Sequence, residues 1–395
     1  MTDDADRRQA WRFVVAMGVV SLWADVCYEG MRAAVGPYLE ALGARAAVVG
    51  AIAGTGELVG FGLRYVAGRY ADRTGRYWPL TFLGYGTNLI VAPLLAVVGS
   101  WPAVAALVMV ERLGKAVRSP AKATIVAAAA ERIGAGTAFG LHTAMDQIGG
   151  VSGPLITAAI LAAGGGYRGA FAALTVAAAL SLVALAWARR LQPAPAARTR
   201  PDVPWSRRAL AGYLAGVALC GFGMADWALL AFHQVHVRLW SPAWVIAAYA
   251  AAMAVEGVAA LIVGRLYDRW PGRGAGILAL ALLVGAAYPL AALSTVPAAV
   301  LVGVGLWALI GAAVEAVAKA GIAERVAPAA RGSAYGLYYA VYGVAWWLGS
   351  LTLGVAYDAG PRVAAVVATV ALVAAAAVLV VTGRSTGPPA AADLP

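Results

Sequence analysis

Residues 275–314 read AGILALALLVGAAYPLAALSTVPAAVLVGVGLWALIGAAV and contain no Asp, Glu, Lys or Arg. A helix of about 20 apolar residues crosses the roughly 30 Å hydrocarbon core of a bilayer. This stretch is therefore long enough to cross a membrane twice. Further uncharged runs occur at 78–110, 169–188 and 363–381. Together these runs predict a polytopic helical membrane protein.

The composition of the 395 residues supports the same class, because 62% are hydrophobic and only 12% are charged. Soluble domains carry about 25% charged residues, so the composition argues against a water-soluble enzyme. The first residues, MTDDADRRQAWRF, mix acids with arginines, which argues against a cleavable signal peptide. The formal net charge is +11, but the basic residues are spread between apolar spans and indicate topology rather than nucleic-acid binding. Cys27 and Cys220 are expected to be small packing residues.

Apolar runs broken by Gly, Pro and charged residues predict an all-α integral membrane protein with twelve transmembrane helices. Most Lys and Arg residues fall on one side if the N-terminus is cytoplasmic, so both termini are expected in the cytoplasm. The expected spans are 12–36, 46–66, 77–98, 101–121, 134–163, 168–189, 208–236, 243–264, 274–293, 297–320, 332–357 and 361–382.

An internal repeat divides the chain into two pseudo-symmetric six-helix bundles. GRYADR at 68–73 recurs as GRLYDR at 264–269, and GTAFGLHTA at 136–144 recurs as GSAYGLYYA at 332–340. Both pairs have the same offset, and a Pro- and Arg-rich stretch separates the halves. We therefore predict an N-terminal bundle at 1–190, a cytoplasmic linker at 191–207 and a C-terminal bundle at 208–395. Repeated halves are typical of transporters with a binding site between them.

With these features the sequence resembles the major facilitator superfamily. GRYADRTGR, between the second and third spans, is similar to the cytoplasmic loop signature of that family. In the fifth span, GGVSGP at 149–154 is similar to the glycine-proline signature that the family associates with drug/proton antiporters, although the glycine expected after the proline is missing. Arg112, Gly114, Lys115 and Arg118 loosely resemble a basic signature of the fourth span. The resemblance implies alternating access between two bundles.

Acidic side chains within the spans are the first candidates for proton coupling, because an ionised group at the bilayer centre costs at least ~2.5 kcal/mol. Asp25 and Glu29 lie four residues apart on one helical face, an arrangement suited to carrying a proton. Arg32 follows three residues later, and a structural ion pair with Glu29 is the alternative. Asp226 stands in MADW much as Asp25 stands in WADV, so it is the third candidate. His142 is either a proton relay or a packing residue.

Other residues are candidates for the wall of a substrate cavity. Arg112 could bind an anionic solute, and a pair with the adjacent Glu111 is disfavoured because neighbouring helical residues do not face each other. Four aromatic residues within 335–346 share one helical face, which can stack on a solute or pack between helices. Asp146 and Glu256 belong either to the cavity or to the junction of the halves. The candidate cavity residues are Arg32, Arg112, Asp146, Glu256, Tyr335, Tyr339, Tyr342 and Trp346.

The sequence therefore predicts a proton-coupled secondary transporter of the cell membrane that exports small amphipathic solutes. Proton-coupled uptake of a small anionic nutrient, held by Arg32 and Arg112, is the alternative. A membrane enzyme or a non-transporting sensor is a remote alternative, because neither a reactive constellation nor a soluble output domain is found. No phosphate-binding loop of the Walker type occurs. We expect no cofactor, no metal and no nucleic-acid partner, and a protein that acts as a monomer.

The loop motif and its repeat predict a cytoplasmic latch. Asp72 ends the second span close in topology to Arg118 and to the N-terminus of the eleventh span, where a helix dipole favours an anion. By the repeat, Asp268 is expected to use Lys319. The predicted latch residues are Gly68, Asp72, Arg73, Gly75, Arg76, Arg118, Asp268 and Lys319.

Replacing Asp72 by Asn should slow transport and leave the protein folded, because the latch loses its negative charge. Transport by the purified protein in liposomes, together with its thermal midpoint, measures both effects. Wild-type transport rates in Asp72→Asn would contradict the latch.

Overall fold

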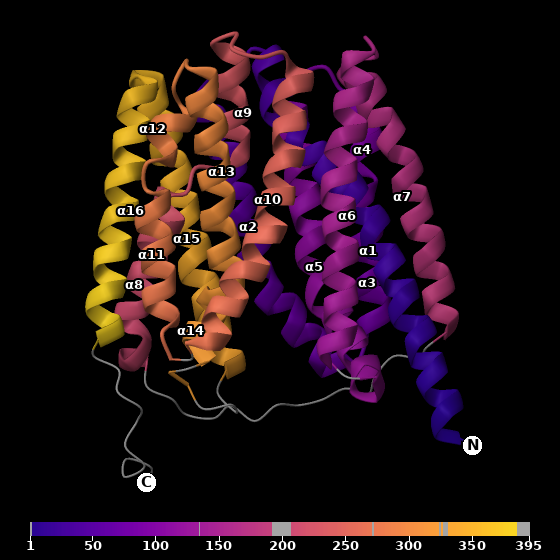
Figure 1. The fold of residues 1–395 in the computed structure, drawn as a ribbon. Helices are drawn as coiled ribbons and strands as arrows, with labels where there is room; N and C mark the ends of the chain where they lie inside the picture. Colours follow the sequence, from indigo (N-terminus) through magenta and orange to yellow (C-terminus); the bar gives the residue numbers. More distant parts are fainter. Residues whose placement is uncertain are drawn as a thin grey trace. The chain divides into compact units, whose positions relative to one another are not determined.

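The computed structural model describes residues 2–133, 135–191, 207–270, 272–323, 325–326 and 331–384. Every regular element within these ranges is helical (Figure 1). The elements are α1 (Thr2–Ala41), α2 (Ala46–Thr74), α3 (Tyr77–Leu89), α4 (Val91–Leu95), α5 (Trp101–Ile133), α6 (Ala135–Ala162), α7 (Gly166–Leu191), α8 (Arg207–Gly223), α9 (Trp227–His236), α10 (Pro242–Arg269), α11 (Gly274–Gly285), α12 (Tyr288–Ala292), α13 (Pro297–Ala313), the π-helix η1 (Val314–Ala318), α14 (Lys319–Ala323), α15 (Arg331–Ala359) and α16 (Pro361–Arg384).

The helices correspond to the twelve predicted spans when α3 is joined to α4, α8 to α9, α11 to α12, and α13 to η1 and α14. Nine stretches in the described part of the chain are long and apolar enough to cross a membrane by length and composition. One boundary prediction was wrong: the fourth span was expected to end near residue 121, but α5 continues to Ile133. Lys122 therefore lies within a helix and not in a loop.

The described chain forms two compact units. Unit 1 consists of residues 1–45, 55–200 and 227–253, and unit 2 consists of residues 46–54, 201–226 and 254–395. Helices α2 and α10 therefore each contribute to both units. Residues 192–206, most of the predicted linker, lie outside the described residues, and the bundle boundaries inferred from the repeat remain a prediction.

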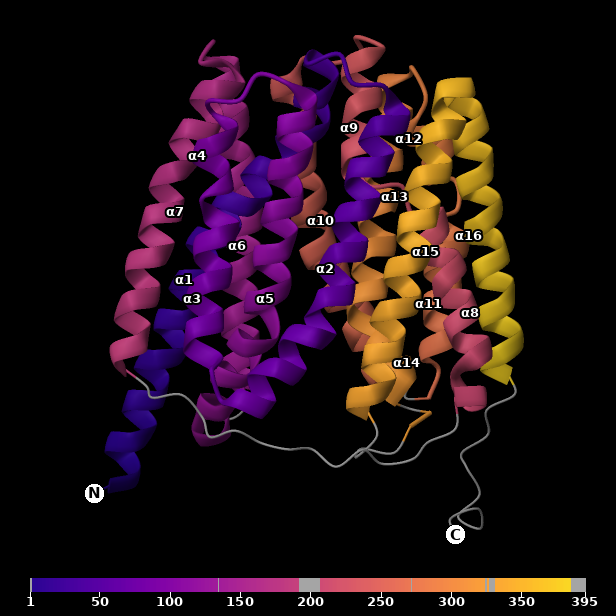
Figure 2. The ribbon, with the colours of Figure 1, turned by 180° about the vertical axis from the view of Figure 1, so that it is seen from behind.

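Unit 1 is organised around α1, which packs against α6 on one side and α7 on another (Figure 2). Glycines allow the first of these contacts. A Cβ atom added to Gly149 of α6 would lie 2.4 Å from the carbonyl oxygen of Leu22, and one added to Gly153 would lie 2.2 Å from that of Val26. The two backbones are therefore in direct contact. The glycine-rich signature joins α6 to α1 within unit 1, which is a packing role.

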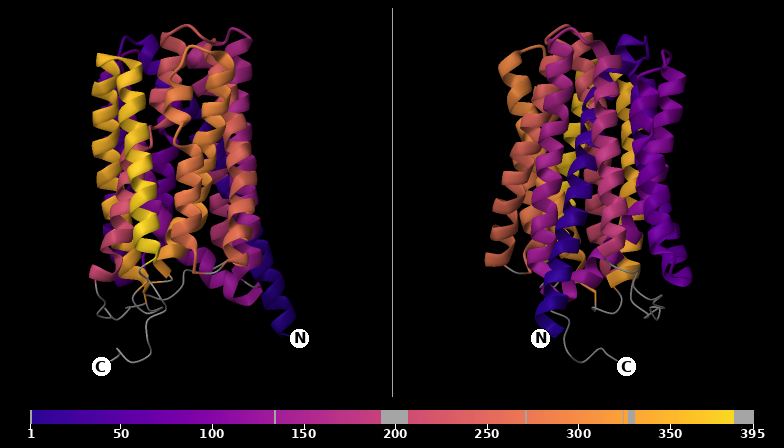
Figure 3. Two further views of the ribbon diagram at one scale, coloured as in Figure 1. Left: turned by 60° about the vertical axis from the view of Figure 1, so that its left-hand side comes forward. Right: turned by 90° about the vertical axis from the view of Figure 1, so that its right-hand side faces the viewer.

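Unit 2 is built from helices that lie side by side, with α16 along α8 and α11 (Figure 3). The predicted seventh span is broken at residues 224–226, between α8 and α9. The Tyr288 hydroxyl accepts a hydrogen bond from Ala225 N and donates one to the carbonyl of Gly223, while Trp307 Nε1 donates to the carbonyl of Ala225. These side chains satisfy the backbone groups that the break exposes. Asp226 lies at this break and is buried.

The loop signature GRYADRTGR forms the end of α2 and the two residues, Gly75 and Arg76, that connect it to α3. Gly75 ends α2 in the left-handed conformation, with φ 66°, and its N–H bonds to the carbonyl of Ala71. A residue with a β-carbon is disfavoured in this conformation, which explains the glycine at this position of the motif. Gly68 lies against Pro120 of α5 at ordinary contact distance. The motif thus defines the turn between two helices of unit 1.

The glycine contacts make a prediction about stability. Gly149→Ala and Gly153→Ala should each destabilise the protein by about 1–3 kcal/mol, because the new methyl group meets a backbone carbonyl that cannot rotate away. Gly150→Ala is the matched control, since a Cβ there would find no atom closer than 3.9 Å. Thermal unfolding of the purified protein measures all three. Equal midpoints for the three variants would contradict close packing of α1 on α6.

Candidate functional site: a charged cavity in unit 1

A cavity of about 270 Å³ lies among α1, α5, α6 and the first half of α10. Three carboxylates and three cations line it, together with a serine, a glutamine, a glycine and a methionine. We call it the charged cavity. Its residues are Asp25, Glu29, Lys115, Arg118, Ser119, Lys122, Asp146, Gln147, Gly150 and Met253.

Helical periodicity explains how these residues meet. Asp25 and Glu29 are four residues apart on α1, as predicted, while the three cations of α5 follow steps of three and four. Such spacings place side chains on one face of a helix. Gly150, whose Cβ position is open, lies between the glycines that contact α1. The close approach of α6 therefore brings its polar face to the acids of α1.

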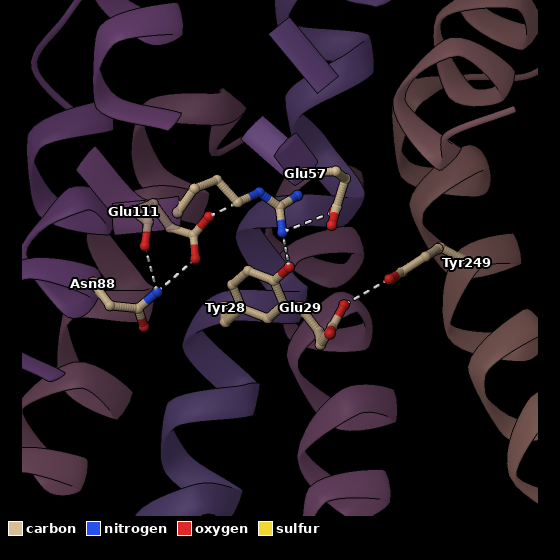
Figure 4. A network of polar contacts seen from close by, with 7 residues as sticks. Tyr28, Glu29, Glu57, Asn88, Glu111 and Tyr249 are labelled. Carbon is tan, nitrogen blue, oxygen red and sulfur yellow. Dashed lines mark hydrogen bonds and ion pairs between the residues drawn. The ribbon is translucent and has the colours of Figure 1, made fainter. Parts of the chain in front are cut away.

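Glu29 is fixed by a residue from a distant part of the sequence. The Tyr249 hydroxyl of α10 donates a hydrogen bond to Glu29 Oε2 at 2.6 Å (Figure 4). The Tyr249 ring packs on Trp227, whose Nε1 donates to the carbonyl of Ala33. Tyr249 and Trp227 thus attach α10 and α9 to α1 within unit 1. The sequence alone gave no signal for this contact.

A chain of polar contacts joins a cation of the cavity to one of its carboxylates. Lys122 Nζ donates to Ser21 Oγ at 2.8 Å, and Ser21 Oγ lies 3.3 Å from His142 Nε2. The other ring nitrogen, Nδ1, lies 3.5 Å from Asp146 Oδ1. When Lys122 donates to Ser21, the serine proton is free to point at Nε2, which leaves Nδ1–H facing Asp146. Nδ1 and Asp146 Oδ1 are buried and make no hydrogen bond with described residues, so this last contact is an ion pair only when His142 is protonated.

Arg112 lies in a buried network next to the charged cavity, and Tyr28 contacts both, because its hydroxyl accepts from Arg112 and its ring lies under Lys115. Arg112 Nη1 is 3.1 Å from Glu57 Oε1 and donates to the Tyr28 hydroxyl, while Arg112 Nε is 3.4 Å from Glu111 Oε2 (Figure 4). The Asn88 amide donates to Glu111 as well. The prediction that Glu111 and Arg112 would not pair was wrong, because both side chains are long enough for their charged groups to meet although adjacent helical residues point apart. The guanidinium of Arg112 therefore already forms ion pairs with two buried carboxylates of unit 1.

The other predicted cavity residues fall in different places. Arg32 is close enough to Glu57 and Tyr28 to interact with both electrostatically. Asp226 and Glu256 belong to unit 2, where the Glu256 carboxylate lies against Gly311. Of the aromatic stripe on α15, Tyr342 and Trp346 are buried in contact with each other, and the Tyr342 ring lies against Gly221 of α8. Tyr339 packs edge-on against Tyr338. These contacts favour the packing interpretation of the stripe.

The predicted latch residues are also dispersed. Asp72 accepts a hydrogen bond from the Tyr77 hydroxyl at 3.1 Å, whereas Arg118 lies in the charged cavity over the ring of Tyr85. Their predicted pairing is therefore not formed in this structure. Arg73, Arg76 and Asp268 are exposed at helix ends, and the side chain of Lys319 lies outside the described residues.

Sequence reasoning missed the cation face of α5. The signal was available, because Lys115, Arg118 and Lys122 have helical spacing, but all three were taken as residues of the cytoplasmic side. Within the described residues, no group of three or more His, Cys, Asp or Glu side chains could hold a metal ion.

The sequence of residues 17–314 matches the family model of the Major Facilitator Superfamily. The chain belongs to this family. It is therefore a multi-pass membrane transporter rather than an enzyme, in agreement with the family resemblance of the GRYADRTGR motif.

Relatives and solved structures agree with this assignment. Proteins described as uncharacterized from Mycobacterium tuberculosis and Mycobacterium bovis are 39% identical over 363 residues, covering 88% of this chain and 87% of each relative. A POT family transporter in complex with a thioalcohol-conjugated peptide superposes with TM-score 0.77 at 13% identity, covering 94% of this chain and 96% of that chain. The nucleoside transporter NupG superposes with TM-score 0.68 at 14% identity, covering 94% and 98%. At these identities the likeness shows the fold alone.

The buried network makes a second prediction about stability. Arg112→Met should destabilise the protein by about 3–5 kcal/mol, because Glu57 and Glu111 lose a buried ion-pair partner. Unfolding of the purified protein by heat and by denaturant measures the effect. The control is Arg69→Met on the exposed end of α2, which should change stability little. An Arg112→Met variant as stable as the control would contradict a structural role for this arginine.

Proposed function

We propose that the chain is a proton-coupled antiporter that exports a small charged solute in exchange for protons. The observation that carries this proposal is the presence of three carboxylates in one cavity of unit 1. Each of them can hold either a proton or a cationic group of a solute. The sequence alone favoured an amphipathic solute, and the charged lining of the cavity favours a small and polar one.

Competition for the carboxylates supplies the coupling. A carboxylate that holds a proton is neutral and attracts a cationic group weakly, whereas release of the proton restores the negative charge. Proton and solute therefore oppose each other's binding, and this opposition is reciprocal. Asp25 is the best placed of the three, since it makes no hydrogen bond or ion pair with another described residue.

The polar chain from Lys122 through Ser21 and His142 to Asp146 supports a proton pathway. Its contacts of 2.8, 3.3 and 3.5 Å join two groups of the same cavity without passing through apolar side chains. A proton arriving at His142 would compete with Lys122 for the lone pairs of Ser21. Protonation and the position of Lys122 are thus linked, which gives the cavity a second way to respond to protons.

Uptake of a small anion is the second candidate function, and a specific observation favours it. Lys115 and Arg118 face the cavity without a carboxylate partner among the described residues. Arg112, the anion ligand expected from the sequence, is instead occupied by Glu57 and Glu111. Counterflow of labelled solutes in liposomes distinguishes the two functions, because exchange for protons acidifies the compartment that the solute leaves.

Neutral mimics of the carboxylates test the proposal. Asp25→Asn and Glu29→Gln, made singly, should each abolish accumulation driven by a pH gradient, because the proton loses its binding group. Solute exchange should largely remain, because the other two carboxylates of the cavity still bind the cationic group. Liposomes that contain a pH-sensitive dye and labelled solute report both fluxes.

The matched control is Glu40→Gln, which makes the same change near the end of α1. Glu40 lies outside the charged cavity, and its Oε1 atom is 3.4 Å from His236 Nδ1. It should keep proton-driven transport. If both cavity variants still accumulate solute when only a pH gradient is supplied, protons are carried elsewhere, with Asp226 the next residue to test.

A further inference from the structure

Two cations of the charged cavity are held by aromatic rings instead of carboxylates. Lys115 Nζ lies 3.5 Å from the centroid of the Tyr28 ring, and the guanidinium carbon of Arg118 lies 4.3 Å from that of Tyr85. Both rings are almost completely buried, and so is Arg118. The Nε atom of Arg118 is buried without a hydrogen-bond partner among the described residues.

A cation that lies over an aromatic ring keeps N–H groups that can still donate hydrogen bonds. The face of an aromatic ring attracts a cation but does not replace the hydrogen bonds that the cation makes to water. A buried guanidinium normally finds carboxylate or phosphate oxygens, which match its geometry. Three carboxylates share the cavity and act on these cations electrostatically, but none forms an ion pair with Lys115 or Arg118 among the described residues. Glu29 is bonded to Tyr249, Asp146 faces His142, and Asp25 makes no direct contact with either cation. Lys115 and Arg118 are therefore positioned for an acceptor that comes from outside the protein.

The platform under Arg118 is fixed by backbone contacts. A Cβ atom added to Gly84, next to Tyr85, would lie 2.6 Å from Arg118 N, and one added to Gly114 would lie 2.5 Å from Asn88 N. Helices α3 and α5 thus touch at these two glycines. Because the contact is between backbones, the spacing of the two helices that carry Tyr85 and Arg118 does not require a ligand.

We infer that Lys115 and Arg118 form a preformed site for the anionic group of the transported solute, and that this solute is a small zwitterion. The statement that the solute also carries a cationic group rests on the proposed function, in which the cavity carboxylates bind such a group. A solute with both groups can neutralise both sets of charges, whereas a simple cation or anion leaves one set unpaired. A cavity of about 270 Å³ suits a molecule of amino-acid size.

Binding to the purified full-length protein in detergent tests the inference without any gradient. The probes are free amino acids, aminoalkyl phosphates, amino-acid methyl esters as cations, N-acetyl amino acids as anions, and inorganic phosphate. Ligands that bind the native state raise its thermal midpoint. We expect a zwitterion to raise the midpoint more than its ester or its N-acetyl form, and the carboxylate and phosphate series show which anionic group fits. No shift with any zwitterion, or equal shifts with the cationic esters, would overturn the inference.

Variants of Tyr85 and Arg118 localise the site. Tyr85→Phe should bind like the wild type, because the Tyr85 hydroxyl is buried without a hydrogen-bond partner among the described residues. Tyr85→Leu removes the ring and should weaken zwitterion binding about tenfold, and Arg118→Gln should weaken it further. Unchanged affinity in Tyr85→Leu and Arg118→Gln would place the anion elsewhere.

A measurement on the wild-type protein avoids variants that fail to fold. The chain has three lysines, Lys115, Lys122 and Lys319, so labelling by an amine-specific reagent can be read residue by residue. A bound zwitterion should protect Lys115 in proportion to its occupancy, with Lys319 of unit 2 as the internal reference. Labelling of Lys115 that saturating zwitterion does not change would contradict the site.

Failure of this inference can be distinguished from failure of the proposed function. Zwitterion binding that depends on Arg118, without proton exchange in liposomes, would retain the anion site and reject the antiporter. Proton exchange driven by a purely cationic solute, unaffected in Arg118→Gln, would retain the antiporter and reject the anion site.

Discussion

The backbone contact between α1 and α6 is the interaction on which the site depends. Gly149 and Gly153 allow the two helices to touch at the carbonyls of Leu22 and Val26. Residues on the adjoining faces, Asp25 and Glu29 on one helix and the Asp146 to Gly150 segment on the other, are thereby brought to one cavity. A side chain at either glycine would separate the helices and, with them, the carboxylates that the cavity combines.

Charges inside a membrane protein must be offset, and unit 1 does this in two different ways. Around Arg112 the charges are paired directly, with buried carboxylates and a tyrosine hydroxyl in contact with the guanidinium. Around Lys115 and Arg118 the cations rest on aromatic rings. Direct pairing produces a stable and closed network, whereas ring contacts leave donors available. This difference separates a structural arginine from candidate ligand-binding residues on the same helix.

The charged cavity also explains why one helix of a membrane protein carries so many ionisable residues. Helix α5 contains Glu111, Arg112, Lys115, Arg118 and Lys122. Glu111 and Arg112 pair with each other and with Asn88 and Glu57, Lys122 donates to Ser21, and Lys115 and Arg118 lie over the rings of Tyr28 and Tyr85. Neighbours within unit 1 therefore offset part of the cost of burying each charge. An exchange mechanism can use such a balanced site, because a solute and protons then replace one another without leaving a charge unpaired.

Periodicity and composition were sufficient to predict an all-α membrane fold of twelve spans and the transporter family, because apolar length and the GRYADRTGR motif are local properties of the sequence. The position of Asp25 and Glu29 on one face of α1 was predictable for the same reason. The partners of these residues were not. Tyr249 donates a hydrogen bond to Glu29, which lies 220 residues away in the sequence. Arg112 forms ion pairs with Glu57 and with its own neighbour Glu111, although the sequence suggested that it would bind a solute. The rotation of each helix and the close contacts at glycines determine which cation forms ion pairs with buried carboxylates and which cation faces the open cavity. Only the tertiary structure decides these two features.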